Sequence, residues 1–156
     1  MKRIFLFICL ILIGSIVLGA TNALAQKKKM KKEPIMWAAE DIKWETPKDA
    51  PPGMMVASLW GDMSKKGPYG ALVKFPAGAK IPLHYHSNDA KVIVISGSMT
   101  IAPEGGAEKT YGQGSYLTPL GGSKHTTSIG DAGCTAFQEG SGPFDTKMVE
   151  PPKEKK

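Results

Sequence analysis

Residues 82–97, PLHYHSNDAKVIVISG, place two histidines one residue apart and follow them with an apolar run that closes on a glycine. Alternate side chains of a β-strand share a face, so His84 and His86 lie on the same face if this segment is extended. Neutral imidazole is a good ligand for zinc, iron, copper, nickel and manganese, so such a pair can share one ion. An exposed strand can carry the same pair by chance, and the rest of the chain has to decide between the two interpretations.

Short β-rich segments recur from residue 55 onward, separated by glycine- and proline-containing turns such as GDAG (130–133). They are MVASLW (55–60), YGALVKF (69–75), PLHYH (82–86), KVIVIS (91–96), SMTIA (98–102), SYLTPL (115–120), KHTTSI (124–129) and CTAFQE (134–139). No helix-period apolar pattern of useful length appears after residue 33. Many short strands at regular spacing predict an all-β fold, either an antiparallel sandwich or a barrel.

The third and last histidine of the protein, His125, lies in a later predicted strand, shortly after Pro119-Leu120-Gly121-Gly122. All three histidines therefore fall in one predicted site.

Two segments resemble the two conserved motifs of the cupin superfamily. Gly78, the two histidines and the run to Gly97 resemble the first motif, G-x5-H-x-H-x3-4-E-x6-G. GSYLTPLGGSKH (114–125) resembles the second, G-x5-P-x-G-x2-H, with the spacing shifted by about a residue. The resemblance covers roughly residues 55–145 and is closest to small single-domain bacterial cupin-like proteins, on the runs LWGD (59–62), GPYGALVKFPAG (67–78), VISG (94–97) and GPFD (142–145).

This resemblance implies a jelly-roll β-barrel of two antiparallel sheets. It also implies one divalent metal ion inside the barrel, held by two histidines and a carboxylate of the first motif and a histidine of the second. Carried over to this chain, the histidines are His84, His86 and His125. The sequence does not choose among Zn, Fe, Ni, Cu and Mn.

The motif carboxylate is where this chain departs from the pattern. The expected glutamate falls on Ala90, or on Lys91 with the longer spacing, and neither can ligate as a carboxylate. Asp89 is adjacent and is the candidate fourth ligand, although strand alternation would turn it to the other face. Without Asp89, a three-histidine site with open positions for water, oxygen or a chelating substrate remains. A barrel that has lost its metal is the remaining alternative.

Several other side chains have an expected place in the barrel. The candidate polar lining consists of Tyr85, Tyr116, Thr118, Thr127, Gln138 and Glu139, and alternation alone does not decide between the last two because a bulge would reverse them. Trp60, Phe75 and Phe137 are predicted core residues, and Cys134 a buried small hydrophobic one.

The resemblance implies a small-molecule ligand. If the protein is an enzyme, a dioxygenase is the leading class, with metal-assisted isomerisation or hydrolysis behind it, although no side chain identifies itself as a general base. The alternative is a non-catalytic module that binds or senses a ligand or a metal. Pairing into a homodimer through the sheets, with residues 35–50 as an exchanged strand, is also implied by the resemblance.

The N-terminus has the pattern of a secretory signal peptide. Met1-Lys2-Arg3 precedes an uncharged apolar run, and Ala23-Leu24-Ala25 offers a cleavage site. This predicts an exported protein, periplasmic or secreted, with an uncleaved membrane anchor as the alternative. The predicted boundaries are 1–25 for the signal peptide, 26–50 for a basic tail and N-terminal arm, 51–148 for the barrel and 149–156 for a C-terminal tail.

The net charge of +6 belongs to the ends of the chain. Residues 33–152 hold 10 Lys and Arg against 13 Asp and Glu, while lysines crowd residues 27–32 and 153–156. Such runs are usually solvated, so a nucleic-acid-binding function is not expected, and the mature form is expected to be soluble with at most weak lysine contact to a membrane surface. Cys134 is the only cysteine after the predicted signal peptide, so the core or a metal must hold the fold.

Overall fold

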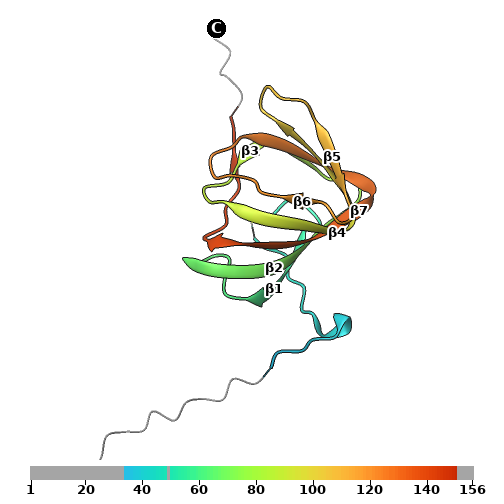
Figure 1. Cartoon of the computed structure of the whole chain (residues 1–156), viewed down its shortest axis with the longest axis vertical. Coiled ribbons are helices and arrows are strands. Elements are labelled where there is room, and N and C mark those ends of the chain that lie inside the picture. Colours follow the sequence, from blue (N-terminus) through green and yellow to red (C-terminus); the bar gives the residue numbers. More distant parts are fainter. Residues whose placement is uncertain (1–33, 49, 151–156) are drawn as a thin grey trace, which may run out of the picture. The chain divides into compact units, whose positions relative to one another are not determined.

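The structure is a computed structural model, and it describes residues 34–48 and 50–150. In this part of the chain there is one 3-10 turn and no α-helix (Figure 1). The elements are η1 (Ala39–Asp41), β1 (Met55–Trp60), β2 (Gly67–Phe75), β3 (Lys80–Tyr85), β4 (Ala90–Pro103), β5 (Lys109–Gly112), β6 (Tyr116–Leu117), β7 (His125–Gly142) and β8 (Lys147–Met148). All the strand pairs are antiparallel, which confirms the predicted all-β class.

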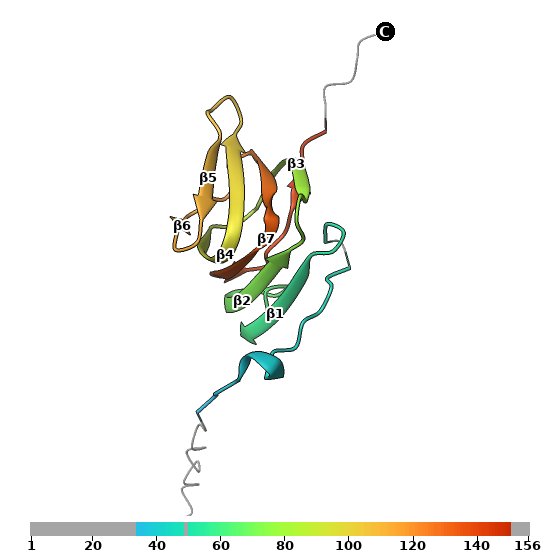
Figure 2. The ribbon, with the colours of Figure 1, turned by 90° about the vertical axis from the view of Figure 1, so that its right-hand side faces the viewer.

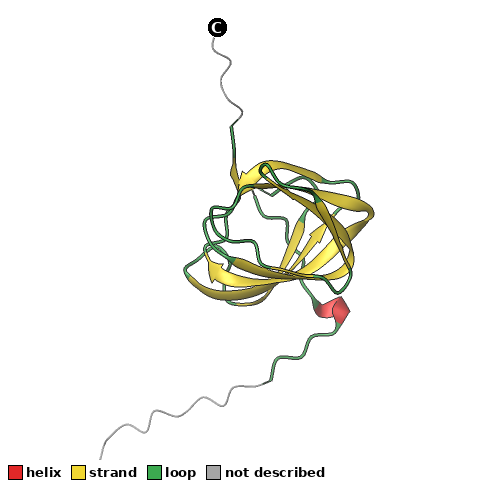
Figure 3. Cartoon of the chain, turned by 45° about the horizontal axis from the view of Figure 1, so that its top comes forward, coloured by secondary structure: helices red, strands yellow, loops and turns green. Residues whose placement is uncertain are grey.

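The long strands β4 and β7 join the two sheets of the jelly roll into one hydrogen-bonded network. The strands follow one another in the order β1-β2-β7-β3-β8, and β4 pairs with β5, β6 and β7. The C-terminal half of β7 lies between β2 and β4, whereas its N-terminal half lies between β3 and β4 (Figures 1 and 2). Figure 3 shows the strands wrapping around a common interior, as predicted for a jelly-roll barrel.

The predicted division of the chain into short strands was wrong at two places. Segments 91–96 and 98–102 are both parts of β4, and the expected turn at 130–133 lies inside β7. Gly97 and Gly133 have φ values of 72° and 73°, and a Cβ on Gly97 would collide with the carbonyl oxygen of Gly133. The register also shifts between Gly97 and Met99, where β7 carries extra residues. The two strands therefore bend together through a bulge instead of ending in turns.

Two short strands were not expected from the sequence. β5 completes a hairpin with β4, and the two-residue β8 pairs with β3. β6 is also only two residues long, where a six-residue strand was predicted at 115–120.

The core consists of two buried clusters. The larger contains Val92, Val94, Met99, Leu117, Ile129, Cys134 and Ala136, and the smaller contains Val56, Ala71 and Val73. Phe75 packs against both, and the burial of Cys134 (3 % exposed) confirms its predicted role as a small hydrophobic residue. Burial also raises the pKa of the Cys134 thiol, which favours the neutral thiol over the thiolate.

Trp60 was wrongly predicted to be a core residue. It is 47 % exposed and lies against Gly70, with its ring centroid 5.6 Å from that of the half-buried Phe137. Gly70 has no side chain, so the indole covers this part of the outer face of the sheet.

The N-terminal arm before β1 contacts the sheet through one isolated antiparallel bridge, between Glu45 and Val56. Glu45 and Val56 exchange two backbone hydrogen bonds of 2.8 Å, and the Lys74 ammonium lies 4.2 Å from the centre of the Trp44 ring. The compact unit that contains the barrel begins at Trp37. The predicted signal peptide, the lysines of residues 27–32 and residues 151–156 lie outside the described residues. None of the helical segments that the structure does describe has the length and apolar character to cross a membrane.

Candidate metal centre

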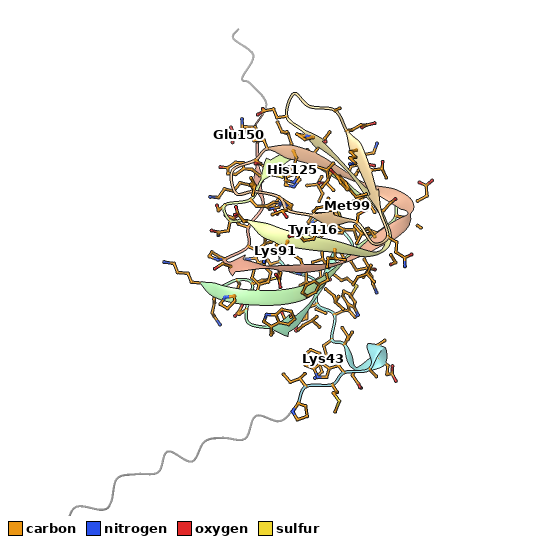
Figure 4. All side chains as sticks on the ribbon, in the orientation of Figure 1. Lys43, Lys91, Met99, Tyr116, His125 and Glu150 are labelled. Atoms are coloured by element: carbon orange, nitrogen blue, oxygen red, sulfur yellow. The ribbon has the colours of Figure 1, made fainter. Side chains whose placement is uncertain are left out.

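The fold brings the three histidines together. His84 is in β3, His86 follows β3 directly, and His125 is the first residue of β7, opposite His84 in the antiparallel register. One nitrogen atom of each ring lies within 4.8 Å of the others. The ring centroids are 4.4 Å apart for His84 and His125, 5.1 Å for His84 and His86, and 5.4 Å for His86 and His125. Figure 4 shows His125 among the side chains that the strands enclose.

A backbone carbonyl oxygen fixes the orientation of each imidazole ring through its Nδ1 atom. The Nδ1 atoms lie at hydrogen-bonding distance from carbonyl oxygens, His84 from Pro82 (2.7 Å), His86 from Asp145 (2.6 Å) and His125 from Ser123 (3.0 Å). A carbonyl oxygen can only accept, so each neutral ring carries its proton on Nδ1 and keeps a free lone pair on Nε2. Metal-binding histidines in proteins are oriented by hydrogen bonds of this kind.

Burial favours the neutral form of the His84 and His86 rings. The side chains of His84 and His125 are 1 % and 7 % exposed, and His86 is half-buried. Burial lowers the pKa of His84 from 6.5 to about 4, against the raising effect of its hydrogen bond to Pro82. Burial likewise lowers the pKa of His86. Both rings are therefore uncharged at neutral pH, which is the form that ligates a metal.

The histidines line a cavity of about 80 Å³, enough for two or three waters. Two of the predicted polar lining residues, Thr127 and Gln138, lie on its wall. Gln138 is buried and its Nε2 donates a 2.8 Å hydrogen bond to the hydroxyl of Tyr69. The choice between Gln138 and Glu139, which alternation left open, is therefore settled in favour of Gln138.

The other predicted lining residues lie away from this cavity. Glu139 points outward, 2.9 Å from the ammonium of Lys91, and Tyr116 is 59 % exposed. Tyr85 and Thr118 are not on the cavity wall either. For Tyr85, strand alternation explains this, since its neighbours in the sequence are the two histidines that face inward.

Alanine occupies the position of the missing carboxylate. Ala90 is 2 % exposed and lines the histidine cavity, while Lys91 is exposed and pairs with Glu139. The structure does not bring Asp89 to the histidines, because its Oδ1 accepts a 2.7 Å hydrogen bond from the backbone of Gly121. Among the described residues, the group of candidate ligands contains no carboxylate.

Asp145 and Phe144 support the site, and the sequence did not single them out. The backbone oxygen of Asp145 holds His86, and its carboxylate accepts hydrogen bonds from Ser87 N (2.7 Å) and Ser87 Oγ (2.8 Å). The Phe144 ring stacks on His86 with centroids 4.6 Å apart. The run GPFD (142–145) was a signal of family resemblance, but its contact with the loop after β3 is not visible in the sequence.

Three neutral nitrogen donors around a small cavity fit one divalent ion of the kind that accepts imidazole, and they leave further coordination positions open.

No curated protein matches the chain by sequence. Among solved structures, the polyketide cyclase RemF from Streptomyces resistomycificus is 16% identical, with a TM-score of 0.64 over 78% of this chain and 89% of that one. A sugar phosphate isomerase of the cupin superfamily from Silicibacter pomeroyi is 22% identical, with a TM-score of 0.55 over 69% and 76%. Oxalate decarboxylase from Bacillus subtilis, a protein with Mn(II) centres, is 16% identical, with a TM-score of 0.54 over 72% and 32%.

At these identities the structural similarity establishes the fold, which is that of cupins, as the two sequence motifs predicted. The model of one family matches residues 19–147, most of the chain. The protein belongs to that family, which is described as a domain of unknown function (DUF4437).

Proposed function

We propose that this protein holds one divalent metal ion through Nε2 of His84, His86 and His125 and binds a small molecule at that ion. The observation that carries the proposal is the anchoring of all three Nδ1 atoms to carbonyl oxygens, which leaves three lone pairs on neighbouring rings. Without a metal, three neighbouring imidazoles would gain little from lying so close together, because none of them can donate a hydrogen bond to another from Nε2.

The donor set favours some metals over others. Zinc, iron, nickel and copper accept imidazole nitrogen readily, whereas manganese prefers carboxylate oxygen. The cavity offers no carboxylate among the described residues, so manganese is the least favoured of the five candidates.

A bound ion would supply a Lewis acid or a redox centre. The chain's own residues would hold and surround the ligand: Thr127 and Gln138 offer hydrogen bonds, and Val92 and Met99 exclude water. A dioxygenase-type oxidation is the leading reaction class, and isomerisation is the second. Enzymes share this fold, a cyclase and an isomerase among them, which supports catalysis as one use of the site.

A non-catalytic binding or sensing module is the second candidate. The cavity wall, as far as the structure describes it, carries no Asp, Glu, Lys or Tyr that could move a proton. This composition suits reversible binding of a ligand as well as it suits chemistry at the metal.

Metal analysis of the full-length protein tests the site. About one ion per chain is expected in the wild type. The ion should be lost in His84→Ala and in His125→Ala. It should be retained in Asp89→Ala, because the wild-type Asp89 carboxylate is hydrogen-bonded to Gly121 and not directed to the metal. A wild-type protein that binds none of Zn, Fe, Ni, Cu and Mn on reconstitution would refute the proposal. Oxygen uptake by the loaded protein with catechols, flavonols or diketones then separates an oxygenase from a binding module.

Export is part of the same proposal. It rests on the sequence of residues 1–25 alone, with the charged start, apolar run and A-x-A site. N-terminal sequencing of the protein recovered from the exported fraction is expected to begin at Gln26. A mature protein that retains Met1 would contradict cleavage.

A further inference from the structure

Among the described residues, the wall of the cavity around the three histidines carries no negatively charged side chain. Its polar wall residues besides the histidines are Thr127, Gln138 and Thr146, all of them neutral. A divalent ion held by neutral imidazoles keeps its full charge of two, in surroundings of low dielectric where that charge acts strongly. A bound ion in this cavity therefore needs a counter-charge that the described wall residues do not supply.

The acidic groups closest in sequence to the site are engaged elsewhere. The carboxylate of Asp89 accepts from Gly121, that of Glu139 pairs with Lys91, and that of Asp145 accepts from Ser87 and lies 3.5 Å from the ammonium of Lys147. None of these three residues lines the cavity. Neutralisation of the ion by one of these three carboxylates would require breaking its present contact.

Ala90 leaves space where a carboxylate would otherwise extend from the wall. Its side chain is a single methyl group, it is 2 % exposed, and it lines the same cavity as the histidines. The free volume of about 80 Å³ admits the oxygen-bearing end of a molecule, a group of a few heavy atoms.

Hydrogen-bond donors are available beside that space. The Gln138 amide donates one of its two N–H bonds to Tyr69, which fixes the orientation of the amide and leaves the second N–H free to donate. The hydroxyl of Thr127 lies on the same wall. Donors of this kind bind an anionic oxygen more strongly than a neutral one.

We infer that the ligand of this centre is a small oxygen anion, a carboxylate or an enolate, whose charged oxygen occupies the space beside Ala90. The inference rests on the proposed metal binding and names the chemical class of the molecule that binds there. The ligand brings the negative charge that the glutamate of the first cupin motif would otherwise supply.

Acetate and acetamide test the charge requirement, because they match in size and differ in charge. The full-length protein is loaded with Co²⁺, and each probe is titrated while the visible absorption of the cobalt is recorded. Acetate is expected to change the spectrum with saturation, and acetamide to bind at least about tenfold more weakly. Equal affinity for the two probes, or no response to acetate, would overturn the inference.

Substitutions at Ala90 test whether the anion binds beside this residue. Ala90→Glu is expected to raise the affinity for Zn²⁺ by about tenfold or more and to abolish the response to acetate, because the new carboxylate supplies the missing charge. Ala90→Gln fills the same space without charge, so it is expected to block acetate without this gain in Zn²⁺ affinity. Acetate binding that persists unchanged in both variants would place the anion elsewhere and overturn the inference.

The two proposals fail in different ways. If the wild-type protein binds no metal in the titration, the proposed function fails and the inference falls with it. If it binds one ion and does not discriminate acetate from acetamide, only the inference fails. Should Ala90→Glu not fold, the comparison of the two probes on the wild-type protein still decides.

Discussion

The position of a single proton determines what each histidine of this site can do. A hydrogen bond from Nδ1 to a carbonyl keeps the neutral tautomer with a free Nε2 in all three rings. Burial also lowers the pKa of His84 and of His86. These two effects prepare the rings to bind a metal at neutral pH, and they also make the protein sensitive to acid.

The metal-free protein is expected to lose stability as the pH falls from about 6.5 to about 4. His84 has its pKa lowered by burial to about 4 in the folded protein, against 6.5 for an ordinary histidine. Within this window the unfolded chain binds more protons than the folded one, so acid favours unfolding. Urea unfolding of chelator-treated protein at several pH values measures the effect. A His84→Gln variant should show a shallower decline, and an equally steep decline would contradict the assignment.

Asp145 is expected to matter for metal affinity although it is not a ligand. Asp145→Ala removes the carboxylate that holds Ser87 and so loosens the carbonyl that orients His86. A loss of about tenfold in Zn²⁺ affinity is expected, as for other groups that orient metal ligands. Competition with a chromophoric chelator measures it.

Asp89→Ala is the matched control for Asp145→Ala. It also removes a carboxylate that accepts a backbone hydrogen bond, but that bond leads to Gly121 and to no histidine. Equal losses in the two variants would show that the effect is not transmitted through His86.

The long strands β4 and β7 owe their shape to one close approach of two glycines. Gly97 and Gly133 both have positive φ, and there is no room for a Cβ on Gly97 against the backbone of Gly133. The strands turn the corner between the two sheets at this point, which places their separate halves on either side of the interior.

Gly97→Ala is expected to destabilise the protein more than Gly78→Ala. Both glycines have positive φ, 72° and 68°, so each alanine carries a backbone strain of about 1–2 kcal/mol. Only at Gly97 does the new methyl group also collide with backbone, whereas nothing lies within 4 Å of a Cβ on Gly78. Denaturant unfolding of the two variants compares them, and equal destabilisation would argue against the close approach.

The barrel as a unit has few means of stabilisation besides its core. Its one cysteine in the described residues is free, and the two buried clusters are made mainly of small and medium side chains. A metal that ties β3 to β7 should therefore contribute visibly to folding.

Zn²⁺ is expected to raise the melting temperature of the wild-type protein, and a chelator to reverse the rise. At a free concentration about 100 times the dissociation constant, a ligand that binds only the folded state adds about 2.7 kcal/mol. Differential scanning calorimetry of the wild type and of His84→Ala measures the difference. A rise of the same size in the variant would mean that the metal binds elsewhere.

Local features of the sequence were sufficient for the class of fold and for the pair His84 and His86. The alternation of strand side chains puts His84 and His86 on one face, and glycine- and proline-rich turns mark most of the strand ends. Both effects act between residues close in the chain, so they can be recognised without knowing the rest of the fold. The cupin motifs then added His125 and the barrel, and the absence of a glutamate at position 90 was visible from the start.

Only the tertiary structure decided how these pieces meet. Whether GDAG (130–133) is a turn depends on β4 bending beside it, and whether Gln138 or Glu139 faces inward depends on the register of β7. The hydrogen bonds that place Asp145 against Ser87 join residues 58 apart in the sequence. Register and bulges follow from the pairing of distant strands, and a shift of one residue reverses every side chain, so no local pattern could determine them.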